Sequence, residues 1–263
     1  MRSWLLLCVG AVIVCAGCSR EPETPPADPA PELSFKDSTV VVRAHGCNGL
    51  VEDCGGVEVH FPVFNGNGSR ASDYLNYAVR AFFVSQLGGS LPNQPDTASA
   101  VTFPDIIKES KLLMADYTEE KAAFPMMAVV WTVQGSGSVI CNDSIVCVQL
   151  EATTFLGGAH PNSVTDFVMV HVPTGKPVQL SGLVRNMKAF LNVAEQTFKK
   201  QVGIKGNDYA EKGYMMQDGK FTLPLASGIT TDSVILYYNP YEIAPYVVGP
   251  TRISLPRTVL EAN

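Results

Sequence analysis

The side chains best suited to chemistry are a histidine and two carboxylates near one glycine-rich turn. His160 closes the tetrapeptide Gly-Gly-Ala-His at 157–160, and Glu151 and Asp166 stand on either side of it. An imidazole presented at a sharp bend could act as a general base. It could instead hydrogen-bond the nearby backbone and only hold the turn, and we favour that structural role. The chain spacing of the two carboxylates does not define the separation in space that glycoside hydrolysis requires.

The four histidines do not form a metal-binding pattern. His45, His60, His160 and His171 show no H-E-x-x-H, H-x-H or comparable ligand spacing, so no metal site is predicted. No G-x-S-x-G elbow, Walker loop or dinucleotide-binding fingerprint occurs either. We therefore expect a protein without a metal or cofactor, and a non-enzymatic function in preference to catalysis.

The four cysteines in the body of the chain are expected to form disulfides. An exported protein favours bridges over free thiols, and four cysteines allow three connectivities. Local pairing is the simplest, as Cys47–Cys54 and Cys141–Cys147. Zinc is the competing interpretation, but C-x6-C and C-x5-C lack the close C-x2-C spacing of structural zinc sites. Each short bridge should contribute about 2–3 kcal/mol to stability.

A hairpin must position His160. The segment 153–176 reads TTFLGGAHPNSVTDFVMVHVPTGK, with a strand end, the glycine turn, an alternating strand over 165–172 and a second turn. Glycine adopts positive φ without the steric cost of other residues, so the pair lets the chain reverse there. Apolar residues occupy both faces of the second strand, with Phe167 and Met169 beside His171 on one, and Val168, Val170 and Val172 on the other. We expect this strand to be buried on both faces and the turn to lie at the surface.

The same segment resembles a module of bacterial extracytoplasmic proteins. After the Gly-Gly-Ala-His turn and its strand come Thr-Gly-Lys at 174–176 and Val-Gln-Leu-Ser-Gly-Leu at 178–183. A second block follows, with Phe-Thr-Leu at 221–223, Tyr-Glu-Ile-Ala-Pro-Tyr-Val-Val-Gly at 241–249 and Ile-Ser-Leu-Pro at 253–256. Both blocks are similar to the C-terminal module of the family that includes the lysozyme-sensing domain of the anti-sigma factor RsiV and the non-catalytic N-terminal part of the peptidoglycan deacetylase PdaC. The resemblance covers residues 151–260, and more loosely 35–150.

The resemblance implies a binding module. In the family the best-understood activity is recognition of lysozyme, a cationic enzyme, so the expected partner is lysozyme, another envelope protein or a peptidoglycan fragment. Exposed Tyr and Pro on irregular backbone suit interfaces, although core packing is the alternative for the tyrosines. A small peptidoglycan hydrolase with His160 as base, and a structural lipoprotein without a ligand, are the alternative functions. The candidate contact residues are Gly157, Gly158, His160 and Pro161 in the turn, and Tyr241, Pro245 and Tyr246 in the second block.

The N-terminus carries an export signal. One basic residue, Arg2, precedes an apolar run from Trp4 to Ala16, which is too short to span a bilayer comfortably. Cys-Ala-Gly-Cys at 15–18 resembles a bacterial lipobox, whose last cysteine is lipidated after cleavage, although its first position is usually Leu. We expect a lipoprotein signal peptide over 1–17 and a lipid anchor on Cys18, with ordinary secretory cleavage as the alternative. Ser19 stands where Asp would favour inner-membrane retention, so in a Gram-negative cell the expected location is the outer membrane.

A proline-rich, acidic stretch follows the anchor. Residues 19–33 read SREPETPPADPAPEL, with almost nothing apolar to bury, so 18–34 is expected to be an extended tether. The whole chain is 46% hydrophobic and 17% charged, as in ordinary globular proteins. Removal of residues 1–17 takes away only Arg2, which leaves 18 basic and 25 acidic residues, a balance of 18 − 25 = −7. A protein with this negative charge is poorly suited to binding nucleic acid, and it could attract a cationic partner. A need for solubility is the alternative explanation of the charge.

Strand and helix patterns alternate over the remaining residues. Periodicity predicts strands over 39–44, 57–64, 126–134 and 145–155, a polar turn over 135–143, and helices over 69–87 and 103–114. A further helix is expected over 185–202, followed by strands over 221–225, 233–238 and 252–255. The fold class is therefore α+β, with two packed α/β subdomains over 35–150 and 151–263, antiparallel or mixed sheets and a few helices.

Overall fold

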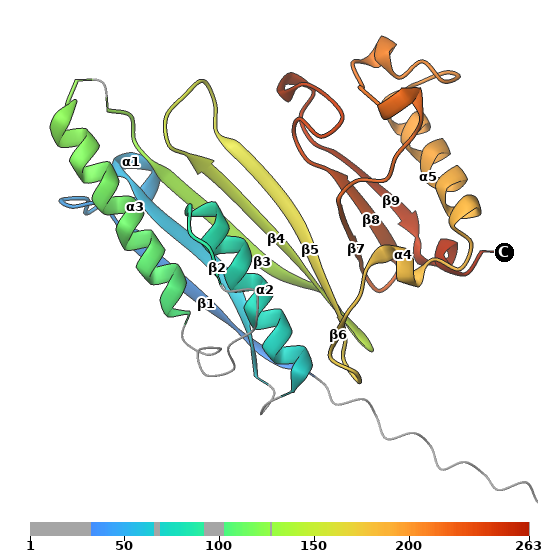
Figure 1. The fold of residues 1–263 in the computed structure, drawn as a ribbon, viewed down its shortest axis with the longest axis horizontal. Coiled ribbons are helices and arrows are strands. Elements are labelled where there is room, and N and C mark those ends of the chain that lie inside the picture. Colours follow the sequence, from blue (N-terminus) through green and yellow to red (C-terminus); the bar gives the residue numbers. More distant parts are fainter. Residues whose placement is uncertain (1–32, 66–68, 92–102, 127, 263) are drawn as a thin grey trace, which may run out of the picture.

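The computed structural model describes residues 33–65, 69–91, 103–126 and 128–262. In these residues the chain forms two β-sheets and five α-helices (Figure 1), which confirms the α+β class expected from the sequence. The predicted signal peptide, Cys18 and the tether up to residue 32 lie outside the described residues. Within the described ranges, no helix has the length and apolar character needed to cross a membrane.

The larger sheet, sheet A, has six strands in the spatial order β1-β2-β3-β4-β5-β6. Neighbouring strands run antiparallel except β2 and β3, which are parallel because the chain crosses over through α2 and α3 between them. The strands are β1 (Ser34–Arg43), β2 (Gly56–Asn65), β3 (Thr132–Asn142), β4 (Ile145–Phe155), β5 (Asn162–His171) and β6 (Lys176–Pro177).

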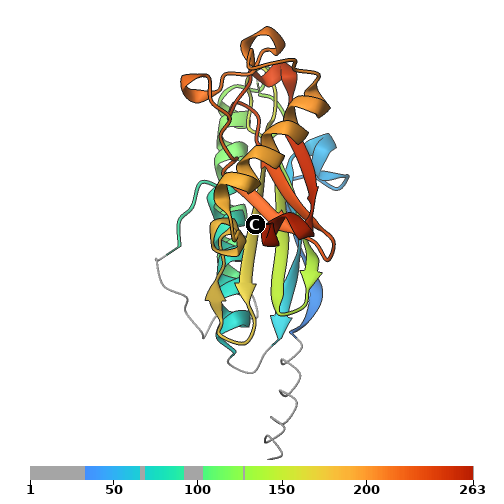
Figure 2. The same cartoon turned by 90° about the vertical axis from the view of Figure 1, so that its right-hand side faces the viewer.

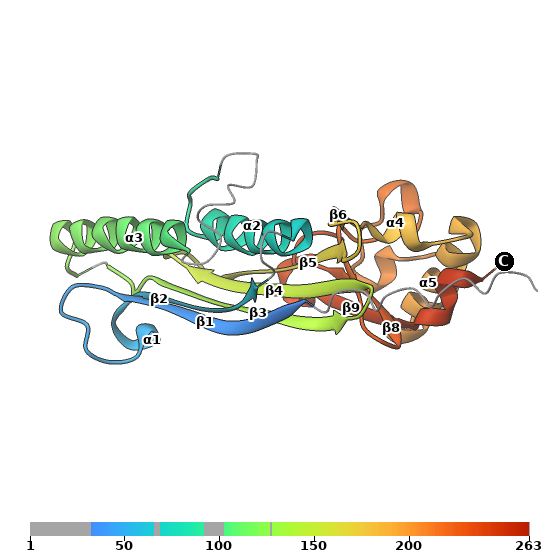
Figure 3. The ribbon, with the colours of Figure 1, turned by 90° about the horizontal axis from the view of Figure 1, so that it is seen from below.

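Two long helices cover one face of sheet A (Figure 3). α2 (Arg70–Gln86) begins after Ser69, whose hydroxyl accepts a hydrogen bond from the Ser72 N–H. Its apolar stripe, which includes Leu75, Val79 and Phe83, is fully buried. α3 (Pro104–Ala123) starts on a proline and continues well past the predicted end at residue 114. The short α1 (Val51–Cys54) lies on the other side of the sheet (Figure 3).

A smaller antiparallel sheet, sheet B, packs beside β5 (Figure 1). Its strands are β7 (Ala226–Ile229), β8 (Ser233–Tyr238) and β9 (Thr251–Pro256). α5 (Met187–Val202) packs on β9 and directs Phe190, Ala194 and Phe198 into the core. The remaining short elements are α4 (Leu180–Leu183) and the 3-10 turns η2 (Ala210–Lys212), η3 (Gln217–Gly219), η4 (Tyr246–Val248) and η5 (Arg257–Glu261).

Sheet A separates two hydrophobic cores. One core lies between sheet A and the helices α2 and α3, and the other is formed with sheet B and α5. β5 contributes to both, because Phe167 and Met169 are buried in the second core while Val170, and Val172 just after the strand, are buried in the first. The sequence expectation that this strand is covered on both faces is confirmed.

Residues 135–143, expected to be a polar turn, instead form most of β3, and the turn shrinks to Asp143 and Ser144. Two glycines in this segment are required by close neighbours. A Cβ atom on Gly135 would lie 2.6 Å from Phe83 Cε1, and one on Gly137 would lie 3.0 Å from Leu150 Cδ2. Glycine within a strand therefore marks close packing here and not a chain reversal.

The expected boundary between residues 150 and 151 falls inside β4. Because β4 pairs with β3 on one side and β5 on the other, sheet A runs without interruption through that point. The two hydrophobic cores lie on opposite faces of this shared sheet.

Candidate binding site

The two segments expected to contact a partner meet at one end of the molecule. His160 Nε2 lies 3.0 Å from the Tyr241 hydroxyl, although 81 positions separate the two residues in the sequence. The His160 imidazole also stacks on the Tyr246 ring, with centroids 3.6 Å apart and planes inclined by 13°. The two tyrosine rings are 5.7 Å apart. We call His160, Tyr241 and Tyr246 the aromatic tip.

The glycine pair shapes the turn that carries His160. Gly157 and Gly158 have φ angles of 95° and 105°, a region that other residues rarely adopt, as the sequence predicted. His160 Nδ1 lies 2.9 Å from the Pro161 carbonyl oxygen. Because a carbonyl only accepts, Nδ1 of the neutral ring carries the proton, and Nε2 accepts from the Tyr241 hydroxyl. Both ring nitrogens are thus bonded within the tip, which agrees with a structural role for the imidazole.

A hydrogen-bonded loop after β8 holds the two tyrosines. The Asn239 side chain pairs with the backbone of Thr165 in β5, where the Thr165 N–H donates to Oδ1 at 2.7 Å and Nδ2 donates to the Thr165 carbonyl at 2.9 Å. The Glu242 carboxylate accepts from the N–H groups of Asn239 and Leu225, at 2.9 and 2.8 Å. Tyr241 has a φ of 68°, a left-handed conformation that costs a non-glycine residue about 1–3 kcal/mol. The surrounding bonds hold this strained backbone in place.

Replacement of Asn239 by alanine should lower the free energy of unfolding by about 1–3 kcal/mol, because the Thr165 N–H and carbonyl lose their partners. Urea unfolding measures this loss. Asn192→Ala, an exposed change on α5, is the control and should stay within about 0.5 kcal/mol of the wild type. Equal stability of the two variants would show that the Asn239 amide does not hold the loop.

Apolar side chains are exposed around the aromatic tip. Tyr241 is 58% exposed and Val247 is 91% exposed, and Pro245 between them is exposed as well. Leu156, which precedes the glycine turn, is 39% exposed, and Val129, whose Cγ2 would lie 3.3 Å from a Cβ on Gly157, is 40% exposed. An exposed patch of large apolar side chains is typical of an interaction site.

The aromatic tip lies at the end of sheet A opposite the start of the folded region. Ser34 pairs with Asn65 at one end of the sheet, whereas Phe155, which precedes the glycine turn, pairs with Thr132 at the other. β1 has ten residues and therefore spans about 33 Å, which is the approximate distance between these two ends of the sheet. The β4–β5 turn and the loop after β8 lie at the upper end in Figure 1, and Figure 2 shows the orange segment 203–219 at the same end.

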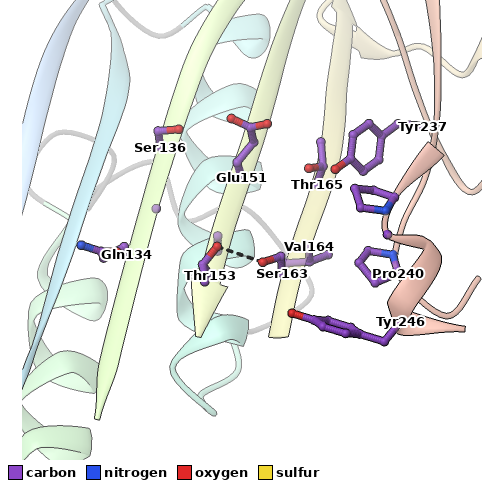
Figure 4. A pocket seen from close by; sticks show the side chains of 14 residues that line it. Gln134, Ser136, Glu151, Thr153, Ser163, Val164, Thr165, Tyr237, Pro240 and Tyr246 are labelled. Carbon is purple, nitrogen blue, oxygen red and sulfur yellow. Dashed lines mark hydrogen bonds between the residues drawn. The ribbon is translucent and has the colours of Figure 1, made fainter. Parts of the chain in front are cut away.

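A polar groove adjoins the aromatic tip on the face of sheet A opposite α2 and α3 (Figure 4). Its volume is about 670 Å³. This groove was not predicted from the sequence, although the alternation of polar residues at the tip end of β4 and β5 could have indicated it. The floor is made by Gln134, Ser136, Glu151, Thr153, Ser163 and Thr165, and the wall includes Tyr237, Pro240 and Tyr246.

Glu151 and Asp166, which flank the glycine turn, face opposite sides of sheet A. Glu151 pairs across the strands with Thr165, so the next residue, Asp166, directs its side chain to the other face. Glu151 lines the groove and accepts a hydrogen bond from Gln149 at 2.8 Å. Burial raises the pKa of Asp166, while a bond from the Phe167 N–H opposes that shift. The two carboxylates therefore do not share a site. Nor does the described part of the chain group three or more metal-ligating side chains.

The predicted bridge between Cys47 and Cys54 is present, with Cα atoms 5.5 Å apart. It closes the loop that joins β1 to β2 and carries α1. Arg43 Nε donates to the Gly49 carbonyl within the same loop at 2.9 Å. This loop lies at the tip end of sheet A, because Arg43 pairs with Gly56 there.

The predicted bridge between Cys141 and Cys147 is absent, which corrects the sequence expectation. The two residues face each other on β3 and β4, next to a bulge in the register, and both are buried free thiols. Each has a different partner. Cys141 Sγ lies 3.5 Å from Asp143 Oδ2 and 3.7 Å from Arg257 Nη1, whereas Cys147 is hydrogen-bonded by the Ile229 backbone in sheet B.

These thiols should be unreactive in the folded protein. Burial raises the pKa of both, that of Cys147 to about 12, so little reactive thiolate forms near neutral pH. We expect the chain from residue 19 onward to show no thiol in a colorimetric titration under native conditions and two thiols per chain in denaturant. Cys147→Ser should reduce the second value to one. No thiol in denaturant would mean that the bridge has formed.

The comparisons with known proteins identify a family match in the second half of the chain. Residues 182–258 match the family described as "Protein of unknown function (DUF3298)". That segment holds α5, sheet B and the loop with Tyr241 and Tyr246, but not the turn with His160. No curated protein matches the chain.

Two solved structures of DUF3298 family proteins share the overall fold. One is from Bacteroides fragilis NCTC 9343, with 18% identity, a TM-score of 0.63, and coverage of 89% of this chain and 94% of that one. The other is from Pseudomonas aeruginosa PAO1, with 17% identity, a TM-score of 0.57, and coverage of 88% and 94%. At these identities the likeness extends to the fold alone. The chain therefore has a DUF3298 match in its C-terminal part and the fold of these two family members.

Proposed function

We propose that the protein is a lipid-anchored envelope lipoprotein that binds a cell-wall-related partner through the aromatic tip. The observation that carries the proposal is the meeting of the turn at 157–161 with the loop at 239–250 in one exposed cluster. Tyr241 is held in a left-handed conformation and yet leaves 58% of its surface exposed. A strained, exposed aromatic residue is better explained by a contact with a partner than by stabilisation of the fold.

The position of the aromatic tip supports a tethered receptor or inhibitor. In this proposal residues 1–17 are removed, Cys18 carries the lipid, and the proline-rich tether leads to Ser34. Because Ser34 and the tip are at opposite ends of sheet A, the tip would face away from the membrane, where a soluble enzyme approaches. In a Gram-negative cell we assign the anchor to the outer membrane.

The sequence resembles the family that includes the RsiV ectodomain and the N-terminal part of PdaC. This resemblance makes lysozyme the first partner to test. A balance of −7 in the proposed mature chain suits a cationic protein, because opposite charges accelerate association and salt weakens that effect. Another envelope protein or a peptidoglycan fragment is the alternative partner. A non-enzymatic role fits the two ring nitrogens of His160, which are both bonded within the tip.

A pair of assays separates a binding module from a hydrolase. The chain from residue 19 onward is first incubated with peptidoglycan alone, and then mixed with C-type lysozyme and passed over a size-exclusion column at low salt. We expect no muropeptide release and co-elution with lysozyme, with less co-elution for His160→Ala. Muropeptide release that is lost in His160→Ala, without co-elution, would replace the proposal with a His160-dependent hydrolase. Neither release nor co-elution would leave a structural lipoprotein or another partner.

A further inference from the structure

The geometry points to a second binding site, in the polar groove beside the aromatic tip, that takes a neutral oligosaccharide. This site lies beside the proposed protein contact, and of the aromatic tip it shares only Tyr246. The groove has a volume of about 670 Å³, within the range of about 300–1,000 Å³ found for small-ligand clefts.

The floor of the groove is a two-row array of hydrogen-bonding side chains. Cross-strand register places Ser136, Glu151 and Thr165 in one row. Gln134, Thr153 and Ser163 form the next row, in which the Thr153 and Ser163 hydroxyls are 3.0 Å apart. Figure 4 shows these side chains projecting from three neighbouring strands toward the same side. Hydroxyl, amide and carboxylate groups in this arrangement offer both donors and acceptors to a ring of sugar hydroxyls.

The wall supplies the apolar surface that a sugar also needs. Tyr237, Pro240 and Tyr246 stand beside the β5 end of the floor (Figure 4). A pyranose presents C–H groups on its faces and hydroxyls at its edge. An aromatic or proline wall beside a polar floor matches that amphipathic shape, because the apolar face is removed from water while the edge stays hydrogen-bonded.

The backbone at the floor is already paired, which disfavours a peptide ligand. β3 and β4 each have a strand on both sides, so neither has an open edge for strand addition. The outer edge of β5 is closed at Thr165 by the two hydrogen bonds of Asn239. Recognition at the floor therefore falls mainly to the side chains, and a ligand dense in hydroxyl groups uses them more fully than an extended peptide.

The charge of the lining selects against acidic sugars. Glu151 is the single carboxylate among the groove-lining residues, and none of them is Lys or Arg. A carboxylate accepts hydrogen bonds from hydroxyls and amides but repels uronate or phosphate groups. The expected ligand is therefore a neutral chain of hexoses or of N-acetylated hexosamines.

Calorimetric titration of the chain from residue 19 onward with tetraacetylchitotetraose, cellotetraose and trigalacturonate tests this inference. We expect saturable binding of at least one neutral probe and none of trigalacturonate. The double variant Gln134→Ala/Glu151→Ala should bind at least about tenfold more weakly, since two polar contacts are lost. Glu119→Ala, an exposed change on α3 at the other face, should bind as the wild type does, and thermal melting verifies that both variants fold.

The two neutral probes distinguish a hexosamine ligand from a plain glucan. The inference is overturned if neither neutral probe binds, if trigalacturonate binds as well as they do, or if the double variant binds normally. Lysozyme titration of the same double variant separates this site from the proposed function. Unchanged lysozyme binding is expected, whereas its loss would assign the groove to the protein partner and overturn the sugar site.

Discussion

Alanine in place of Tyr246 is expected to weaken partner binding by about thirtyfold or more, which corresponds to about 2 kcal/mol. The Tyr246 ring stacks on His160, with the ring centroids 3.6 Å apart, and Tyr246 belongs to the exposed loop at 245–248. Its removal takes away an aromatic contact surface and also leaves the His160 ring without its stacking partner. Both losses fall at the centre of the proposed interface, where truncation has its largest effects.

Matched variants separate loss of contact from loss of structure. Val247 and Leu225 are each 91% exposed. Val247 follows Tyr246 directly, whereas Leu225 is bonded to the tyrosine loop through its backbone N–H, which an alanine variant keeps. Val247→Ala should weaken binding measurably, whereas Leu225→Ala should not. His160→Phe keeps a ring for stacking but removes both hydrogen bonds, so its affinity should fall between those of the wild type and Tyr246→Ala. Equal affinities for Tyr246→Ala and Leu225→Ala would contradict an interface at the tip.

Valine in place of Gly228 is expected to destabilise the protein by about 3 kcal/mol or more, because added atoms would overfill the contact between the two sheets. A Cβ atom on Gly228 would lie 2.4 Å from Phe167 Cδ1 and 3.0 Å from Cys147 Sγ. The Phe167 ring lies in the core between the sheets and has little room to move. β7 therefore approaches sheet A this closely only because position 228 has no side chain.

Denaturant unfolding with a matched glycine variant tests the sheet contact. Gly182 in α4 has open space around it and no positive φ. Gly182→Ala should consequently leave the free energy of unfolding unchanged or raise it by at most about 1 kcal/mol. Gly228→Val should lower the denaturant midpoint strongly. If both variants unfold near the wild-type midpoint, the packing of sheet B on β4 and β5 differs from that described.

Local signals predicted the elements whose ends and faces are set by nearby residues. α5 was expected over 185–202 and spans Met187–Val202, because the Asn186 side chain caps its first turn and Gly203, with a φ of 74°, ends it. The two-sided burial of β5 followed from apolar residues at successive positions. Both features depend on neighbours within a few residues along the chain, so periodicity was sufficient.

Long-range packing decided the features that the sequence did not predict. β3 runs through Gly135 and Gly137 because Phe83, from a helix far earlier in the chain, and Leu150 press against them. The glycine turn and the tyrosine segment were each identified as contact candidates, but their meeting depends on the bonds of Asn239 to Thr165, across 74 positions. The groove likewise needs three strands in register. No local pattern encodes such approaches.

In the function proposed above, the aromatic tip binds a cationic enzyme that acts on the cell wall. Calorimetric titration of the chain from residue 19 onward with C-type lysozyme, at low and at physiological salt, tests it most directly. We predict saturable binding that weakens as salt increases, that is weakened about thirtyfold or more in Tyr246→Ala, and that is retained in Leu225→Ala. No heat of binding in either salt at micromolar protein would contradict lysozyme as the partner. Binding that is unchanged in Tyr246→Ala would contradict the aromatic tip as its site.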